Sequence, residues 1–172
     1  MGIPFEQRNF QKELDKKIAG FQKDGIVPTL LLHSCCAPCS SHCIEYLSDY
    51  FHITVFYYNP NISAEEEYRK RVEEQKRFIS EFPAKYKVSF IEGDYDTKEF
   101  YDIAKGYEQC REGGERCFRC YELRLKKTCE TAKAGGFDYF TTTLTISPLK
   151  NSVRLNAVSY THLRAHETLA NL

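Results

Sequence analysis

The alternation of short apolar runs with longer amphipathic stretches is the feature that most constrains the fold. The apolar runs predict four strands, Pro28–Ser34, Ile53–Tyr58, Lys87–Gly93 and Phe137–Thr145. The stretches with helical spacing predict helices over Phe5–Lys23, Ala37–Phe51, Ala64–Phe82, Asp96–Gly106 and Phe118–Ala134. Strands that alternate with helices form a parallel sheet through right-handed crossovers. We therefore predict an α/β fold with about four parallel strands and flanking helices.

Local signals mark the ends of several of these helices. Ser63 is followed three residues later by Glu66, which predicts a capping box at the start of the helix from Ala64. Gly25 follows the first predicted helix, and the pair Gly135-Gly136 follows the last. Glycine at these positions is typical of helix ends.

The size and charge of the chain are those of one ordinary domain. It has 172 residues, with 24 basic and 24 acidic side chains, so no overall positive field indicates a nucleic-acid partner. A local basic stripe would not show in this sum. No apolar run approaches the roughly 18 residues that a bilayer requires. The N-terminal segment is charged and has no apolar core, so we expect a cytoplasmic protein without membrane contact.

Eight cysteines are many for a chain without an export signal. In a reducing compartment, metal binding or catalysis explains them better than disulfides do. Four of them lie in CCAPCSSHC, directly after the first predicted strand and at the start of a predicted helix. Ligands of parallel sheets bind beyond the carboxyl ends of strands, near the point where strand order reverses. The cysteines therefore fall where a functional site is expected.

Two Cys-x-x-Cys pairs leave three interpretations open. Cys36 and Cys39 form the first pair, next to Cys35, and Cys117 and Cys120 form the second. The pairs are too far apart in sequence for a zinc ribbon and suit an iron–sulfur cluster, which accepts scattered cysteines. A zinc-stabilised α/β binding module is one alternative. A thiol–disulfide oxidoreductase that uses Cys36 and Cys39 is the other.

Nearby charges would favour thiolates at both pairs. The helix start after the first strand is expected to lower the pKa of the first thiols. Arg111, Arg116 and Arg119 are close in sequence to the second pair and are expected to offset its negative charge.

The three other cysteines have a simpler interpretation. Cys43 and Cys129 occupy helical positions among apolar residues, and we predict that both face the core. Cys110 is nearer to the second pair, and we predict that it is not a ligand.

Several polar residues near strand ends are candidates for substrate contacts. Asn59 and Asn61 follow the second strand, where they either hydrogen-bond a nucleoside or only form a turn. Tyr68 and Arg71 lie on the next helix, and Tyr68 could stack on a base, although a solvated helix face is the commoner explanation. Lys150 follows the fourth strand and could meet a phosphate.

Several separate motifs together resemble one known family. They are LLLHSCCAPCS, YYNPNI followed by EEYRKR, GDYD, EGGERCFRCYELRLKKTCETA and FDYFTTTLTISPLKN, and they span Pro28 to Asn151. This combination is similar to the epoxyqueuosine reductases of the QueH type. The resemblance implies a Rossmann-like (HUP-like) sheet and the reduction of epoxyqueuosine in tRNA to queuosine, the last step of queuosine biosynthesis.

The resemblance also implies the cofactor and its ligands. A [4Fe–4S] cluster would be held by Cys35, Cys36, Cys117 and Cys120. Cys39 matches a position that is cysteine or aspartate in the family, and it is expected to be catalytic as a ligand of an additional mononuclear iron. The electrons would come from an external low-potential donor.

The last residues no longer resemble this family. Ala157–Leu172 is similar to a translated sequencing-adapter read-through, whereas a real, divergent terminal helix is the alternative. We therefore expect one α/β iron–sulfur reductase domain over residues 1–151, incomplete at its C-terminus, and a non-family tail over 152–172. The family's C-terminal Cys-x-Cys pair has no counterpart in this sequence, so the chain is expected to bind iron and to be inactive or impaired in turnover.

Overall fold

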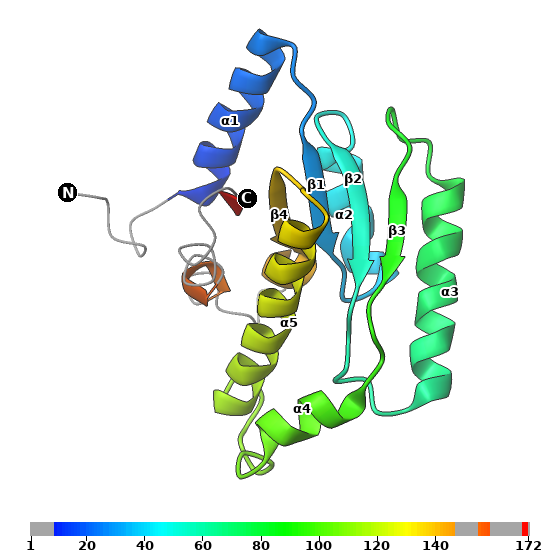
Figure 1. Ribbon diagram of the computed structural model, residues 1–172, viewed down its shortest axis with the longest axis vertical. Coiled ribbons are helices and arrows are strands. Elements are labelled where there is room, and N and C mark those ends of the chain that lie inside the picture. The colour runs from blue at the N-terminus through cyan, green and yellow to red at the C-terminus, as the bar shows by residue number, and fades with distance from the viewer. Residues whose placement is uncertain (1–8, 147–154, 159–169, 172) are drawn as a thin grey trace, which may run out of the picture.

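The computed structural model describes residues 9–146, 155–158 and 170–171. It contains a parallel sheet with helices on both faces (Figure 1). Its strands are β1 (Thr29–His33), β2 (His52–Tyr57), β3 (Ser89–Glu92), β4 (Tyr139–Thr142) and the two-residue β5 (Ala170–Asn171). Their order is β3-β2-β1-β4-β5, and every neighbouring pair is parallel. The predicted α/β class with four main parallel strands is confirmed.

The helices divide between the two faces of the sheet. α1 (Phe10–Asp24), α2 (Ala37–Leu47) and α3 (Glu65–Glu81) pack against one face. α5 (Glu115–Ala134) covers the other face, and α4 (Thr97–Ala104) contacts α5 near the end of the sheet to which the strands point (Figure 1). A 3-10 helix, η2 (Thr143–Ile146), follows β4 directly.

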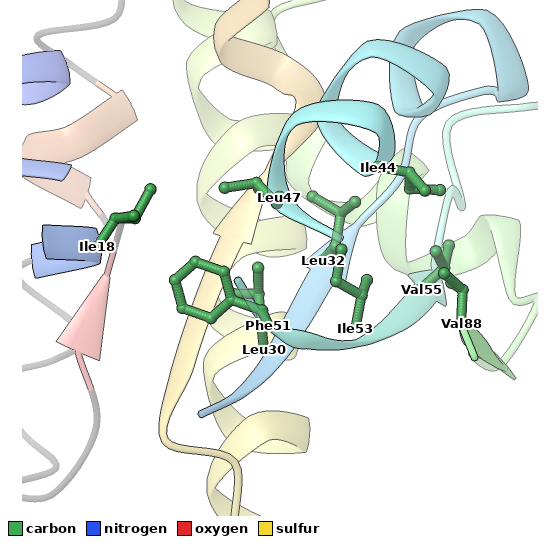
Figure 2. Packing of buried hydrophobic residues seen from close by; sticks show 9 residues of the cluster. All are labelled: Ile18, Leu30, Leu32, Ile44, Leu47, Phe51, Ile53, Val55 and Val88. Atoms are coloured by element: carbon green, nitrogen blue, oxygen red, sulfur yellow. The ribbon is translucent and has the colours of Figure 1, made fainter. Parts of the chain in front are cut away.

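β1 lies at the centre of the sheet, and both of its faces are buried. Leu30 and Leu32 face the α1–α2 side, where they join a core that includes Ile44 and Phe51 (Figure 2). Leu31 faces α5. All three leucines have no exposed surface. This explains why the strand reads as a continuous apolar run, and each such side chain contributes about 1.5–3 kcal/mol by its burial.

The helix ends are partly as predicted. Asn9 caps α1 by accepting from the Lys12 amide at 3.0 Å, and Gly25 closes α1 with a φ of 66°, a left-handed conformation that glycine adopts freely. The predicted capping box is wrong. α3 begins after Ala64 and has no side-chain cap. Glu65–Glu67 occupy its first turn instead, where carboxylates interact favourably with the helix dipole.

The strand order reverses between β1 and β4. In open parallel sheets, ligands bind beyond the carboxyl ends of the strands at such a reversal point. His33 and Thr142 are register partners at the carboxyl ends of these strands. β4 is shorter than predicted because the Leu144 amide donates to the Thr142 side chain at 3.1 Å, which turns the chain into η2. This turn directs Thr143 toward the residues that follow β1.

Part of the predicted tail belongs to the described residues. Residues 155–158 are helical, and the buried Leu155 packs against Tyr121, Leu125 and Leu144. The boundary at residue 151 stays a prediction. Lys150 lies outside the described residues. No helix in the described ranges is both long and apolar enough to cross a bilayer.

Candidate metal centre

The turn from β1 to α2 gathers three thiols. Cys36 is the N-cap of α2 in an extended conformation, with φ −171° and ψ 162°, and Pro38 lies in the first helical turn. Cys39 lies three residues after the cap, where the helix returns its side chain over the same end. The sulfur atoms of Cys35, Cys36 and Cys39 all lie within 4.8 Å of one another, and none of the three forms a disulfide among the described residues. The predicted grouping of these three residues is thus present in the fold.

The spacing of these thiols suits a soft metal. The Sγ atoms of Cys35 and Cys36 are 3.8 Å apart. Two thiolates on one tetrahedral metal, each about 2.3 Å from it, lie about 3.8 Å apart. A zinc or iron ion would therefore find two ligands close to their coordinating positions and the third nearby. The chemistry of this donor set fits thiolate-bound metals of both kinds.

Burial works against free thiolates at this turn. The pKa of Cys39 is raised to about 12, first by burial and then by the neighbouring Cys36 and Cys35. The expected lowering by the helix start is not found for Cys39, because desolvation and crowding of like-charged groups outweigh the helix dipole. A bound metal would replace the thiol protons, as thiolate ligation always requires.

The second pair lies on α5, close to its start. α5 begins at Glu115, three residues earlier than predicted, so Cys117 and Cys120 are both helical. Cys120 is buried, and Cys117 accepts a long hydrogen bond of 3.4 Å from the Gly113 amide. In the described part of the chain, neither thiol belongs to the group within 4.8 Å.

An apolar cluster nevertheless connects the group of Cys35, Cys36 and Cys39 with the second thiol pair. Cys35 and Cys117 both pack against the buried cluster that contains Tyr121, Leu125 and Leu144. The second pair therefore borders the first group across this cluster. A cofactor larger than one ion, with several thiolate ligands, suits this wider arrangement better than a single ion does.

Thr143 holds Cys35 in place. The Cys35 amide donates to the Thr143 hydroxyl at 3.1 Å, and this hydroxyl donates to the Cys35 sulfur at 3.2 Å. The sequence gives no signal for this contact, because it depends on the pairing of β1 with β4.

Gln75 of α3 stabilises the β1–α2 turn through hydrogen bonds with two serines. Its Oε1 atom lies 2.8 Å from the Ser34 hydroxyl and 2.9 Å from the Ser40 hydroxyl, and its Nε2 atom has no partner among the described residues. The two hydroxyls also reach the carbonyls of Cys36 and Ala37, at 3.2 and 3.0 Å. If the Gln75 side-chain amide is turned so that its nitrogen faces both serines, its two N–H groups donate to the two hydroxyls, which donate in turn to the carbonyls. The orientation of such an amide is assigned from its hydrogen-bond network.

A group of buried polar residues lies at the carboxyl ends of β1, β2 and β4, and it consists of His33, Asn59, Arg124 and Thr142. His33 contacts the Thr142 hydroxyl at 2.8 Å and the Tyr58 carbonyl at 3.1 Å. Asn59 donates to the Ser34 carbonyl at 2.9 Å and accepts from the Arg124 guanidinium at 2.5 Å. Asn59 was predicted at this edge, whereas Arg124 was missed. Its signal in the sequence is its spacing of four and seven residues from Cys120 and Cys117.

The other predicted substrate contacts are arranged differently. Asn61 is exposed in the turn after β2. Tyr68 has no exposed surface, and its ring stacks on Tyr95 with centroids 4.0 Å apart. A base could stack on Tyr68 only if Tyr95 moved. Arg71 is half-buried and donates to Glu67 at 2.7 Å. The roles of these residues stay predictions.

The remaining cysteines lie apart from the group within 4.8 Å. Cys129 is buried in the α5 side of the core, and Cys43 packs against the α1–α2 side, as predicted. Cys110 is half-buried just before α5. Two of the predicted arginines near the second pair have their own partners, because Arg119 interacts with Glu115 and Tyr107 and Arg116 donates to the Glu108 carbonyl.

Comparison with known proteins gives one consistent result. A family profile described as "Epoxyqueuosine reductase QueH" matches residues 30–170. The chain is 41% identical over 157 residues to the epoxyqueuosine reductase QueH of Streptococcus pyogenes serotype M1, covering 90% of this chain and 62% of that protein. It is 40% identical over 152 residues to the protein of the same name from Staphylococcus epidermidis, covering 86% and 64%. The protein of that name from Thermotoga maritima is 36% identical over 129 residues, covering 72% and 62%. The chain thus spans a little under two thirds of these curated relatives.

Proposed function

The chain belongs to the epoxyqueuosine reductase QueH family, and on that premise we propose that it is an iron–sulfur oxidoreductase that converts epoxyqueuosine in tRNA to queuosine. The observation that carries the proposal is the group of three thiols at the switch point of the sheet, with a second thiol pair across a shared apolar cluster. Cys35, Cys36, Cys117 and Cys120 would hold a [4Fe–4S] cluster.

The reaction sets requirements that this site can meet. Removal of the epoxide oxygen consumes two electrons and two protons and releases an alkene and water. A bound [4Fe–4S] cluster supplies electrons one at a time, so it must be refilled by an external low-potential donor. Cys39 is the remaining thiol of the group, and we propose that it holds a separate iron next to the cluster.

Other residues of the chain would position the thiols and contact the substrate. Thr143 and Gln75 fix the turn that carries the thiols, through hydrogen bonds to Cys35 and to Ser34. Asn59 lies at the same edge, although its side chain is already engaged with Ser34 and Arg124. Asn61, Arg71 and Lys150 stay candidates for contacts with the nucleoside or the tRNA backbone. A tRNA substrate implies a cytoplasmic location.

The first test is the metal content after anaerobic purification and reconstitution with iron and sulfide. The proposal expects about four irons and four acid-labile sulfides per chain, and a fifth iron if Cys39 binds one. Cys36→Ser and Cys120→Ser should lose the sulfide, whereas the matched variant Cys110→Ser should keep it. One zinc without sulfide in the wild type would contradict the proposal.

The second test is turnover. The reconstituted chain receives tRNA that contains epoxyqueuosine and a strong chemical reductant, and the nucleosides are then separated by mass. Queuosine that forms only with the loaded chain would establish the reductase. If the loaded cluster is present and no queuosine forms, the activity does not reside in this chain alone.

One specific observation favours a second candidate, a zinc-stabilised binding module. The 3.8 Å separation of the Cys35 and Cys36 sulfurs is the ligand spacing of a single tetrahedral ion. The same metal analysis decides between the two candidates. The third interpretation, a thiol–disulfide oxidoreductase that uses Cys36 and Cys39, would instead show a redox-active dithiol in the metal-free chain.

A further inference from the structure

Arg124 is a buried cation on the helix face that carries the second thiol pair. It lies four residues after Cys120 and seven after Cys117, so all three side chains project from one side of α5. Arg124 is only 4% exposed, and Cys120 is 7% exposed. A side chain that is always charged is thus enclosed together with thiols.

The guanidinium contacts an amide and an imidazole ring. It donates to the Asn59 side chain at 2.5 Å and approaches the His33 ring at 3.4 Å. Within the described residues, no carboxylate lies within ion-pair distance of it. Burying an unpaired charge costs several kcal/mol even after the surroundings relax. The arrangement therefore indicates that an anion completes it.

Thiols lie on both sides of this buried arginine. Asn59, which accepts from Arg124, also donates to the carbonyl of Ser34, and Cys35 follows directly. On the other side, Cys117 and Cys120 share the face of α5 that carries Arg124. Both groups of thiols therefore border the residues that hold Arg124.

We propose that Arg124 is the buried counter-charge of the cysteine site, and that its anion is the set of thiolates on a bound metal. Three or four thiolates on one divalent ion leave a net negative charge, as does an iron–sulfur cluster with four thiolates. A fixed cation in a low-dielectric interior stabilises that charge more than an exposed arginine can. Arg124 is a positioning residue, because it acts on the ligands and not on a substrate.

The proposal rests on the thiol ligands of the proposed function, and its test does not require the iron–sulfur cluster. The metal-free chain is titrated anaerobically with Co²⁺, whose charge-transfer absorption reports thiolate ligation. The variants are Arg124→Met, which is apolar and of similar length, and Arg124→Lys, which keeps the charge. Lys126→Met removes one positive charge from an exposed position of the same helix and is the matched control.

The expected result is at least a tenfold weaker Co²⁺ affinity for Arg124→Met, the size typical of groups that support metal ligands. Arg124→Lys and Lys126→Met should stay within about threefold of the wild type, on the same scale. The urea midpoint of metal-free Arg124→Met should not fall, because an apolar residue replaces an unpaired buried charge. A purely structural arginine would instead lower this midpoint without a selective effect on the metal.

Three results would overturn the proposal. They are an unchanged Co²⁺ affinity of Arg124→Met, an equal loss in Arg124→Lys, and the absence of a cobalt–thiolate band in the wild type. If Arg124→Met does not fold, Arg124→Gln, which is neutral and keeps a donor for Asn59, replaces it in the same comparison. A normal cobalt result with no iron–sulfur loading would remove the reductase proposal and leave the counter-charge in place.

Discussion

Thr143 holds Cys35 at two atoms, since one hydroxyl accepts from the Cys35 amide at 3.1 Å and donates to its sulfur at 3.2 Å. The contact joins the end of β4 to the turn after β1. It therefore fixes a candidate metal ligand from outside its own loop.

Thr143→Val should weaken metal binding without a change in any ligand. The valine keeps the shape and leaves the Cys35 amide without its acceptor, and loss of such supporting contacts typically costs about 10–100-fold in metal affinity. Co²⁺ titration of the metal-free chain measures this. Thr145→Val is the matched control, because this exposed residue donates its hydroxyl to the Thr142 carbonyl, at 3.2 Å. Equal affinities of the two variants would show that the Thr143 hydroxyl does not support the site.

Cys39→Ala should separate the cluster from a second iron. Under the proposed ligand set, this variant keeps about four irons and four sulfides per chain, loses a fifth iron and forms no queuosine. Cys43→Ala changes the next turn of the same helix and should retain whatever iron content and turnover the wild type has. Metal analysis and the nucleoside assay give both results. Full turnover by Cys39→Ala would exclude a catalytic role for this thiol.

Two glycines should respond to alanine in opposite directions. A Cβ on Gly93 would lie 3.0 Å from the Phe56 ring and from the Tyr58 side chain, so Gly93→Ala should lower the free energy of unfolding by about 1–3 kcal/mol. Gly20 lies inside α1, and among the described residues a Cβ there would meet no atom within 4 Å beyond its own stretch of helix, so Gly20→Ala should raise the free energy of unfolding by about 0.5–1 kcal/mol. Urea unfolding of the metal-free chain tests both. Similar midpoints for the two variants would contradict the close packing at Gly93.

The stability of the metal-free chain should fall at alkaline pH in part through Cys43. Burial, with a smaller effect of Cys35, raises the pKa of Cys43 from 9.0 to about 11. The folded state therefore holds this proton more tightly than the unfolded state. The stabilisation is complete below pH 9 and is lost as the pH rises toward 11, with a slope of up to about 1.4 kcal/mol per pH unit. Cys43→Ala should show a shallower decline in unfolding free energy over this window. Parallel curves for the two proteins would mean that Cys43 titrates alike in both states.

The sequence predicted the elements better than it predicted their contacts. The apolar run before Cys35 is buried on both faces, and only a central parallel strand gives that pattern, so β1 was clear. The thiol group was also clear, because a Cys-x-x-Cys at a helix start places its sulfurs on one end of the helix. The start of α5 was predicted three residues too late, because a glycine pair is typical of loops, whereas Gly114 is the N-cap of this helix.

The supporting residues could not be found from local patterns. Arg124 is one of many basic residues on an amphipathic helix, and only the packing of α5 on the sheet buries it. Gln75 shares a helix with many exposed charges, and its contact with Ser34 joins residues 41 positions apart. The error at Ser63 has a local cause, since the carboxylates of the first turn of α3 make a side-chain cap unnecessary.

Because β1 is the central strand, it cannot complete its pairing on the ribosome until β4 has been synthesised. β2 and β3 are synthesised soon after β1, but β4 pairs with the other edge of β1, where Leu30 lies opposite Tyr139, 109 positions later. Until that stretch has emerged, the central strand has one open edge, and Cys35 lacks its contact with Thr143. Domains generally fold as units during synthesis. The nascent chain therefore displays three uncovered thiols for as long as it takes to add these residues, and metal capture or oxidation during that interval competes with correct assembly.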